Sequence, residues 1–461
     1  MISTQPSEPL RAKVVELMAQ AKADLSELVA FRSVADPHQQ PPAQCAKAAD
    51  WIVRAFTEVG LQDMPRSTTP DGSDCVHGHA PGPPGAPGAP TVLLYSHYDV
   101  QPPLGEDVWR TPVWELTEGD DGRWYGRGTA DCKGNIVAHL TALRALKAIE
   151  GCFPVNLKLI FEGSEEQGTG GLDAYVPPHA DLLRADTICI VDTGNATLGQ
   201  PTLTTSLRGM TSIDLTLDAL DSAMHSGMFG GSAPDPVAGL IQILASLHDT
   251  DGNTTIDGLD NTGAWNGADY SAARFRTDAH VLEGVDLAGS GTVADMLWAR
   301  FDAATLGIDI PSVDESVNAI QATARARVSL RVPFGVKATD AQDALIEHLR
   351  SRVPWNLRCS VERVASGDPF VGSLSGPGFN ALKAALEESY GKATKTAGQG
   401  GSIPLCNVLQ QTFPDAEIML YGVEEPTCLI HAPNESVAPS EIEHIAFAEA
   451  LFLQKYGASP G

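Results

Sequence analysis

Five short segments of the chain carry side chains that are well suited to bind divalent metal ions. Each segment follows an expected strand or a glycine-rich turn. Two histidines and three carboxylates are the candidate ligands: His97, Asp131, Glu166, Asp192 and His431. This donor set suits zinc, cobalt or manganese, whereas a closed structural zinc site usually recruits thiolates. The residue types therefore indicate a metal centre other than a structural zinc site.

The segment 96–100 places a histidine beside an acid. His97 and Asp99 are two residues apart, so on an extended backbone they point to the same face. A carboxylate in that position can accept the second imidazole proton and strengthen the nitrogen that binds metal. Taken alone, a His-x-Asp pair is more often a surface hydrogen bond, and this segment decides nothing by itself.

Acidic residues stand out in three further segments. The glycines of segment 126–134 permit a tight backbone around Asp131, but they lack the G-x-G-x-x-G spacing of a dinucleotide site. Glu165 and Glu166 are adjacent carboxylates at an expected strand end, where they repel one another unless a cation or proton relieves them. The pair is therefore interpreted either as a metal ligand beside a general base or as two solvated glutamates in a loop. Asp192 ends an apolar strand, where ligand sites of open α/β sheets tend to lie.

Strands and helices alternate in the parts of the chain that carry these segments. Buried strands are expected at 91–96, 155–161, 187–191 and 417–421. Helices are expected at 13–30, 45–59, 135–149, 378–390 and 440–454. The proline-rich stretch 81–90 is expected to be an exposed turn. This alternation predicts an α/β catalytic domain with a mostly parallel sheet flanked by helices.

The middle of the chain follows a different pattern. Residues 210–217 and 321–332 alternate as strands do, and a helix is expected at 236–247. A polar stretch rich in Gly, Asn and Asp runs from 249 to 269. These features predict an inserted α+β domain at 208–366, which leaves 1–207 and 367–461 as the catalytic metal-binding domain.

Composition excludes several classes of partner. The chain has 461 residues and a formal net charge of −27, from 31 Lys plus Arg against 58 Asp plus Glu. A surface this acidic repels nucleic acid and anionic lipid. The sequence contains no run of about 18 apolar residues, so it predicts no membrane span. Eight scattered cysteines without a CxxC pair, and an N-terminus without a secretory pattern, favour free thiols in the cytoplasm.

Taken together and in this order, the five segments resemble the M20 family of dinuclear metallopeptidases. That family includes carnosinase-like dipeptidases, acylases and desuccinylases, and the resemblance covers nearly the whole chain. The resemblance implies that His97 and Asp192 bind one ion and that Glu166 and His431 bind the other. Asp131 would then bridge the two ions.

The resemblance also assigns Glu165 as general base and Asp99 as the residue that orients His97. Two divalent ions carry four positive charges, of which the three carboxylates cancel three. The surplus favours a bridging hydroxide, with the pKa of bound water lowered towards roughly 7. In the implied mechanism this hydroxide attacks the amide carbon, while Glu165 removes the proton from water and passes it to the leaving amine. Ala432, where relatives often have Gly, is the one departure and puts no ligand in doubt.

Two residues of the inserted domain resemble substrate-binding parts of the family. His225, in segment 221–227, matches a histidine that reaches the substrate carbonyl from the partner subunit of a dimer. It would act there as an oxyanion donor. A locally hydrogen-bonded loop histidine is the alternative interpretation. Asn318 is a further candidate, and the resemblance implies a homodimer formed through the inserted domain.

Arg331 matches the arginine that grips the free carboxylate of the substrate in dipeptidase-like members. A planar guanidinium suits this task because it offers a carboxylate two hydrogen bonds. Gly401 and Ser402, in the glycine loop 400–404, match residues that help to hold the same carboxylate. Because Arg325 and Arg327 share a strand face with Arg331, a solvated basic stripe is the alternative.

Together these features predict metal-dependent hydrolysis of the amide bond of dipeptides or short peptides with a free C-terminal carboxylate. Zn²⁺ is the expected metal, with Mn²⁺ or Co²⁺ as alternatives. An N-acyl-amino-acid deacylase or desuccinylase with the same centre is the alternative function. A non-catalytic protein of the same fold is disfavoured because no ligand and no base has been lost.

Overall fold

The structure is a computed structural model that describes residues 7–86, 88–401 and 403–458. The chain forms two compact units, of which the first contains Met1–Thr205, Gly372–Ala397 and Pro404–Gly461. The second contains Ser206–Val371 and Gly398–Ile403. The expected limits of the inserted domain, 208 and 366, lie close to those of the second unit. Residues 398–403, which the sequence pattern assigned to the catalytic domain, belong instead to the second unit.

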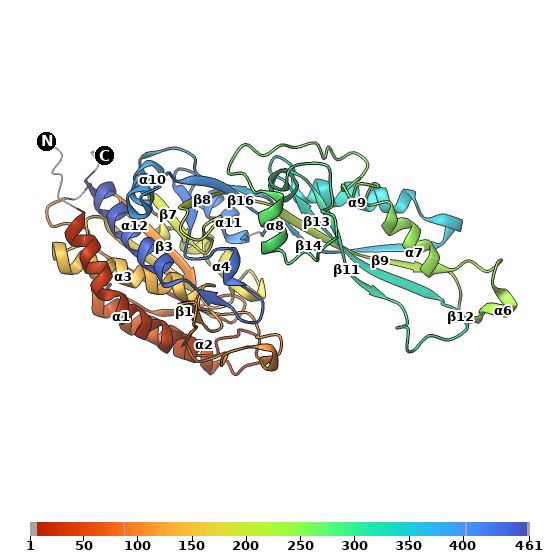
Figure 1. Ribbon diagram of the computed structural model, residues 1–461, viewed down its shortest axis with the longest axis horizontal. Coiled ribbons are helices and arrows are strands. Elements are labelled where there is room, and N and C mark those ends of the chain that lie inside the picture. The colour runs from red at the N-terminus through yellow and green to blue at the C-terminus, as the bar shows by residue number, and fades with distance from the viewer. Residues whose placement is uncertain (1–6, 87, 402, 459–461) are drawn as a thin grey trace. The chain divides into compact units, whose positions relative to one another are not determined.

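A mixed β-sheet forms the centre of the first unit (Figure 1). In spatial order, seven of the nine strands described for this sheet are β1 (Arg66–Thr68), β2 (Asp74–Ala80), β6 (Asn156–Glu162), β3 (Thr91–His97), β7 (Thr187–Val191), β17 (Glu417–Tyr421) and β8 (Thr202–Leu207). The four strands β6, β3, β7 and β17 are parallel, and β1, β2 and β8 are antiparallel to their neighbours. A mostly parallel sheet is therefore confirmed for the centre, with antiparallel edges.

The central strand β3 shows why these strands appear in the sequence as continuous apolar runs. Val92 and Leu94 belong to the core that the strands share with the helices, and Leu93 and Tyr95 are also buried. Successive residues of a strand point to opposite faces, so both faces of β3 are covered. Burial on both faces is typical of parallel strands and removes the polar alternation of a half-exposed strand.

Long helices flank this sheet and share its core. They are α1 (Glu8–Ala30), α2 (Ala43–Val59), α3 (Lys133–Glu150), α10 (Pro377–Tyr390) and α12 (Pro439–Gly457). All five were expected from helical spacing. The helices α1, α3 and α12 pack against one another, as Figure 1 shows. Shorter α-helices of the same unit are α4 (Gly171–Tyr175), α5 (Ala180–Leu183) and α11 (Pro404–Thr412).

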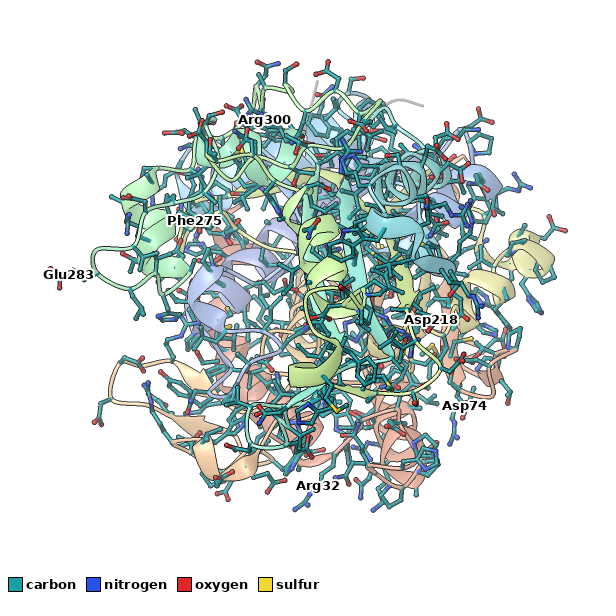
Figure 2. The ribbon with its side chains drawn as sticks, turned by 90° about the vertical axis from the view of Figure 1, so that its right-hand side faces the viewer. Arg32, Asp74, Asp218, Phe275, Glu283 and Arg300 are labelled. Carbon is teal, nitrogen blue, oxygen red and sulfur yellow. The ribbon has the colours of Figure 1, made fainter. Side chains whose placement is uncertain are left out.

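The second unit is built on a four-stranded antiparallel sheet. In spatial order its strands are β11 (Asp302–Asp309), β13 (Thr323–Val332), β9 (Gly209–Asp218) and β14 (Arg358–Gly367). The helices α7 (Pro236–Ala245) and α9 (Ala338–Ser351) pack against these strands and contribute to one apolar core. Figure 2 labels Asp218 at the end of β9 and Phe275 on the short helix α8 (Ala272–Asp278). The polar stretch 249–269 contains no helix or longer strand.

All eight cysteines are free thiols, as their scattered spacing predicted. Five of them are buried and pack as small apolar side chains. Among the described helices, none combines the length and the apolar character needed to cross a membrane.

Candidate metal centre

The parallel strands bring the candidate ligands to one edge of the sheet. β3 ends at His97, Glu166 comes soon after β6, and Asp192 comes directly after β7. His431 lies in the segment that follows β17. Because these strands are parallel neighbours, their carboxyl ends lie at the same edge.

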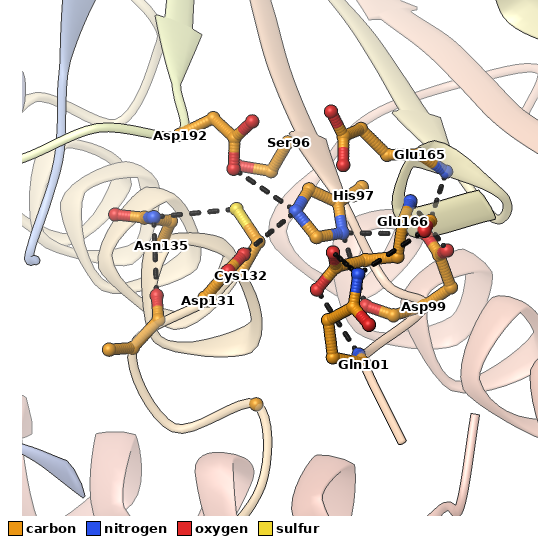
Figure 3. Close-up of polar contacts among 12 residues, drawn as sticks. Ser96, His97, Asp99, Gln101, Asp131, Cys132, Asn135, Glu165, Glu166 and Asp192 are labelled. Atoms are coloured by element: carbon orange, nitrogen blue, oxygen red, sulfur yellow. Dashed lines mark hydrogen bonds and ion pairs between the residues drawn. The ribbon is translucent and has the colours of Figure 1, made fainter. Parts of the chain in front are cut away.

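Asp131 lies between the two histidines. Its Oδ1 is 3.0 Å from Nε2 of His97, and its Oδ2 is 2.9 Å from Nε2 of His431. Nε2 of His97 is also 3.1 Å from Asp192, and Nε2 of His431 is 3.2 Å from Glu166. Figure 3 shows the contacts of His97 with both aspartates. All five predicted ligands therefore come together, and each oxygen of Asp131 faces a different imidazole.

The donor chemistry fits divalent metal ions. Three groups of side chains offer ligand atoms within 4.8 Å of one another: His97, Asp131 and Glu166; Asp131, Asp192 and Glu424; and His97, Cys132 and Asp192. Imidazole and carboxylate donors suit zinc, manganese and cobalt. Cys132 is the poorest of these donors, because its thiol donates to the carbonyl oxygen of Val191 at 3.2 Å and burial raises its pKa well above the ordinary value.

The acids and imidazoles of the cluster strongly shift one another's pKa values. Burial would lower the pKa of His97, but the charge of Asp192 and the hydrogen bond to Asp131 raise it well above its usual range. Hydrogen bonds with Asp131 and Glu166 raise the pKa of His431 to about 11. Burial would raise the pKa of Asp131, but the two histidines hold it well below its usual range. The negative cluster therefore favours a cation at the imidazole nitrogens, where metal ions and protons compete.

Glu165 and Glu166 lie in one short turn but have different partners. The carboxylate of Glu166 accepts hydrogen bonds from the backbone N–H of Gln101 at 3.1 Å and from its side-chain amide at 2.8 Å. Among the described residues, no hydrogen bond or ion pair holds the Glu165 carboxylate. Burial and the neighbouring charge of Asp192 raise the pKa of Glu165 well above the ordinary value, despite the opposing effect of His97. The geometry thus separates a fixed glutamate from one that can bind and release a proton.

The Asp99 carboxylate was expected to accept a hydrogen bond from His97, but its main hydrogen bonds go elsewhere. Nδ1 of His97 lies 3.1 Å from the backbone oxygen of Asp99 and 3.4 Å from its carboxylate. The carboxylate instead accepts hydrogen bonds from the backbone N–H groups of Glu165 and Glu166, each at 3.1 Å. Because a carbonyl can only accept, this contact assigns the proton to Nδ1 and leaves Nε2 facing the cluster.

Glu435 fixes the loop that carries Asp131. It is fully buried and accepts hydrogen bonds from the backbone N–H groups of Gly128, Ala130 and Asp131 at 3.0 to 3.1 Å. It also forms an ion pair of 2.7 Å with buried Arg127. Glu435 has no role in the expectations from sequence, although it lies only four residues after His431.

His431 itself has an unusual backbone. Its φ of 61° lies in the left-handed region, which residues other than glycine seldom adopt. Such conformations cluster at functional sites, where surrounding contacts hold them.

Glu424 is a further acid of the cluster that the sequence analysis missed. It is buried, and one of its oxygens lies within 4.8 Å of ligand atoms of Asp131 and Asp192. Burial, followed by the charges of Asp131 and Asp192, raises its pKa well above the ordinary value. Glu424 follows β17 as Asp192 follows the parallel neighbour β7, so an acid beyond the second strand end was the available signal.

His225 and Asn318 lie together in the second unit. His225 is exposed on the two-residue strand β10 (Met224–His225), which pairs with β12 (Ala319–Ile320). Nδ1 of His225 accepts a hydrogen bond of 3.1 Å from the N–H of Gly227. The neutral ring therefore carries its proton on Nε2, which can donate. The exposed residue Asn318 precedes β12 directly.

Arg331 differs from the other two arginines of β13. Arg325 and Arg327 both form ion pairs with Asp214. Arg331 has no hydrogen bond or ion pair with any described residue. Gly401 is exposed, and Ser402 lies outside the described residues.

Arg208 is a second guanidinium near the glycine loop, and the sequence analysis missed it. It is buried, and its Nε has no hydrogen-bond partner in the described part of the chain. Its Nη2 lies 3.1 Å from the position of a Cβ added at Gly400, so a larger residue there would crowd it. Burial, with a contribution from the charge of Arg331, lowers the pKa of Arg208 to about 10.

Comparison with known proteins identifies the family. Residues 93–455 match peptidase family M20/M25/M40. The chain belongs to this family. Its M20 relatives include a cysteinylglycine-S-conjugate dipeptidase of Corynebacterium striatum, 43% identical over 440 residues, which are 94% of this chain and 95% of that protein. A Cys-Gly metallodipeptidase of Schizosaccharomyces pombe is 30% identical over 86% of this chain and 87% of its own.

A solved structure shares the M20 fold along the whole chain. The dipeptidase Dug1p from Saccharomyces cerevisiae superposes with a TM-score of 0.82 at 24% identity and covers 99% of both chains. The match over residues 93–455 confirms the predicted resemblance to the M20 family, and this superposition confirms the α/β fold.

The buried pair of Arg127 and Glu435 generates a stability prediction. Replacing Glu435→Ala leaves Arg127 buried without a counter-charge and removes the acceptor of three backbone amides. We expect the free energy of unfolding to fall by about 3–5 kcal/mol. Chemical denaturation followed by circular dichroism measures this change. As a control, Glu118→Ala removes an exposed ion pair with Lys22 and should cost about 1 kcal/mol or less; equal small losses in both variants would contradict the role of Glu435.

Proposed function

We propose that this M20 peptidase hydrolyses the amide bond of dipeptides or short peptides that have a free C-terminal carboxylate. The observation that carries the proposal is the arrangement around Asp131, whose two oxygens face two different imidazoles. The relatives from C. striatum and S. pombe, both named dipeptidases, support this substrate class. The test is a panel of dipeptides, Cys-Gly among them, each with its N-acetylated counterpart. Preference for the N-acetylated forms would indicate a deacylase and overturn the proposal.

The proposed cofactor is a pair of divalent ions, Zn²⁺ before Mn²⁺ or Co²⁺. In this proposal His97 and Asp192 would hold one ion, Glu166 and His431 would hold the other, and Asp131 would serve both. Bound divalent ions polarise the scissile carbonyl and make water more acidic. Activity of the metal-stripped enzyme, reconstituted with each metal in turn, tests the choice of metal.

The proposed proton carrier is Glu165. It takes a proton from the attacking water and delivers that proton to the leaving amine. Burial and the charge of Asp192 raise its pKa, and a carboxyl with a raised pKa is better able to donate a proton to the leaving amine. The Asp99 carboxylate positions the Glu165 backbone, and Gln101 keeps Glu166 turned into the cluster.

Replacing Glu165→Gln should lower kcat by roughly 10²- to 10⁴-fold, because the amide cannot carry the proton. The metal content, measured by plasma mass spectrometry, should stay that of the wild type. Glu166→Gln is the matched control and should lose metal together with activity, since this residue is a proposed ligand. A Glu165→Gln enzyme with more than a tenth of normal turnover would contradict the assignment.

The proposed substrate contacts come from residues of the second unit. Arg331, with Gly401 and Ser402, binds the substrate carboxylate, and Asn318 contributes a further polar contact. His225 donates from Nε2 to the substrate carbonyl, a contact supported by the tautomer that its hydrogen bond with Gly227 selects. The absence of any described partner for Arg331 supports a role toward a ligand.

Replacing Arg331→Ala should lower kcat/KM by roughly 10- to 150-fold, because hydrogen bonds to charged groups contribute about 1.5–3 kcal/mol. Arg325→Ala is the control, since Arg325 already pairs with Asp214, and it should retain near-normal kcat/KM. A dipeptide with an amidated C-terminus gives an independent readout. The wild type should discriminate against it and the Arg331→Ala variant should not; equal discrimination by both would rule out the carboxylate contact.

We also propose a homodimer formed through the second unit. β11 lies at the edge of its sheet and exposes the apolar side chains of Leu306 and Ile308, and Ile310, directly after the strand, is also exposed. An exposed apolar edge strand favours pairing with another chain. In analytical ultracentrifugation the wild type should sediment as a dimer and the Ile308→Glu variant as a monomer. A monomeric wild type with full activity would contradict both the dimer and the role of His225 across it.

We propose a cytoplasmic location, which the eight free thiols support. Cell fractionation with an antibody against the chain tests it, and recovery outside the cytoplasm would overturn it.

A further inference from the structure

Glu424 is a buried carboxylate that has no task in the function proposed above. Its residue surface is 6% exposed, and its Oε1 has no hydrogen-bond partner among the described residues. Burying a carboxylate is costly unless it is hydrogen-bonded, neutralised or bound to a cation. A compensating group is therefore expected close to Oε1.

The imidazoles of His97 and His431 only partly offset the burial of Glu424 and the charges of Asp131 and Asp192, so its pKa stays raised. One Glu424 oxygen lies within 4.8 Å of ligand atoms of Asp131 and Asp192, which are both acids. No lysine or arginine of the described chain forms an ion pair with Glu424. Three carboxylates gathered in this way repel one another, and a shared cation is the group that relieves them.

The backbone holds Glu424 at this place. The N–H of Asn195 donates to the Glu424 carbonyl at 2.7 Å, and a Cβ added at Gly194 would lie 2.0 Å from that same oxygen. A Cβ added at Gly422 would lie 2.1 Å from the carbonyl oxygen of Thr193. The two glycines thus allow the segments beyond β7 and β17 to lie against each other. This close approach fixes Glu424 beside Asp192.

We propose that Glu424 is a fourth carboxylate ligand of the metal centre, for the ion that His97 and Asp192 hold. This inference rests on the proposed function and extends its ligand set by one residue. With Glu424 the four carboxylates balance the four positive charges of two divalent ions. Glu424 therefore raises the affinity for one ion of the pair and leaves the ion held by Glu166 and His431 nearly unaffected.

A protonated Glu424 that donates a hydrogen bond to a neighbouring acid is the competing interpretation. A glutamine at this position would preserve that role, because its amide also donates. It would not preserve the role of an anionic ligand. The isosteric substitution therefore separates the two interpretations.

The experiment titrates metal-stripped protein with Zn²⁺, and separately with Mn²⁺, by isothermal calorimetry. The wild type should bind two ions. The Glu424→Gln variant should bind one of them with a Kd raised by roughly 10- to 100-fold or more, the range found when groups supporting a metal site are removed. Glu162→Gln is the matched control: Glu162 is also buried and 6% exposed, but it accepts a hydrogen bond from Tyr95. Both Kd values of this control should stay those of the wild type.

A spectroscopic readout keeps the test valid if Glu424→Gln folds poorly. The Co²⁺-loaded Glu424→Asp variant keeps the charge but withdraws the carboxylate by one methylene, so its ligand-field absorption should shift from that of the wild type. Unchanged Zn²⁺ and Mn²⁺ affinities in Glu424→Gln, or an unchanged Co²⁺ spectrum in Glu424→Asp, would overturn the ligand role while leaving the proposed function intact. A wild type that binds no metal would overturn both.

Discussion

The carboxylate of Asp131 faces two imidazoles at once, and much of the first unit holds it in that position. Its two histidine contacts come from segments more than 300 residues apart in the chain. The loop around it is held by Glu435, whose own charge is balanced by Arg127. A shift of this loop by a fraction of an ångström would lengthen the contact of Asp131 with one histidine and shorten its contact with the other. Buried hydrogen bonds to the backbone of this loop are well suited to prevent such a shift.

The centre concentrates negative charge in a place where burial makes charge costly. Three sequence-predicted acids and Glu424 lie close together, and burial raises the pKa of Glu166 to about 7 despite its contact with His431. In the absence of cations such a cluster destabilises the fold through repulsion and desolvation. A bound cation reverses this effect, because a ligand that binds only the native state stabilises it by mass action. Stability and metal binding of this chain are therefore expected to be linked.

The sequence predicted those strands and site residues that depend on the local pattern of apolar and polar residues. The strands at 187–191 and 417–421 have the bounds that their apolar runs predicted, because both faces of a central parallel strand are buried. The candidate ligands His97, Glu166 and Asp192 followed from strand ends, since parallel neighbours bring their carboxyl ends together. Glu424 and Glu435 were missed because their partners are set by tertiary approach. Glu424 beside Glu425 resembles a solvated turn in the sequence, and only the contact of Gly194 with the Glu424 backbone shows otherwise. The backbone contact of Asp99 with His97 likewise leaves no trace in residue types.

The two sets of proposed functional residues are held in different ways, and this difference has a physical logic. Of the proposed metal ligands, His97 ends a buried strand, and Asp192 and Glu166 follow such strands closely, so the large core of the first unit limits their movement. Arg331 and His225 of the second unit instead keep free hydrogen-bonding capacity, and His225 is exposed on a two-residue strand. A metal centre requires ligands fixed to a fraction of an ångström, whereas contacts to a small substrate must form and release in every cycle. Substitutions of the proposed substrate contacts are therefore expected to change substrate preference while the proposed metal centre keeps its geometry.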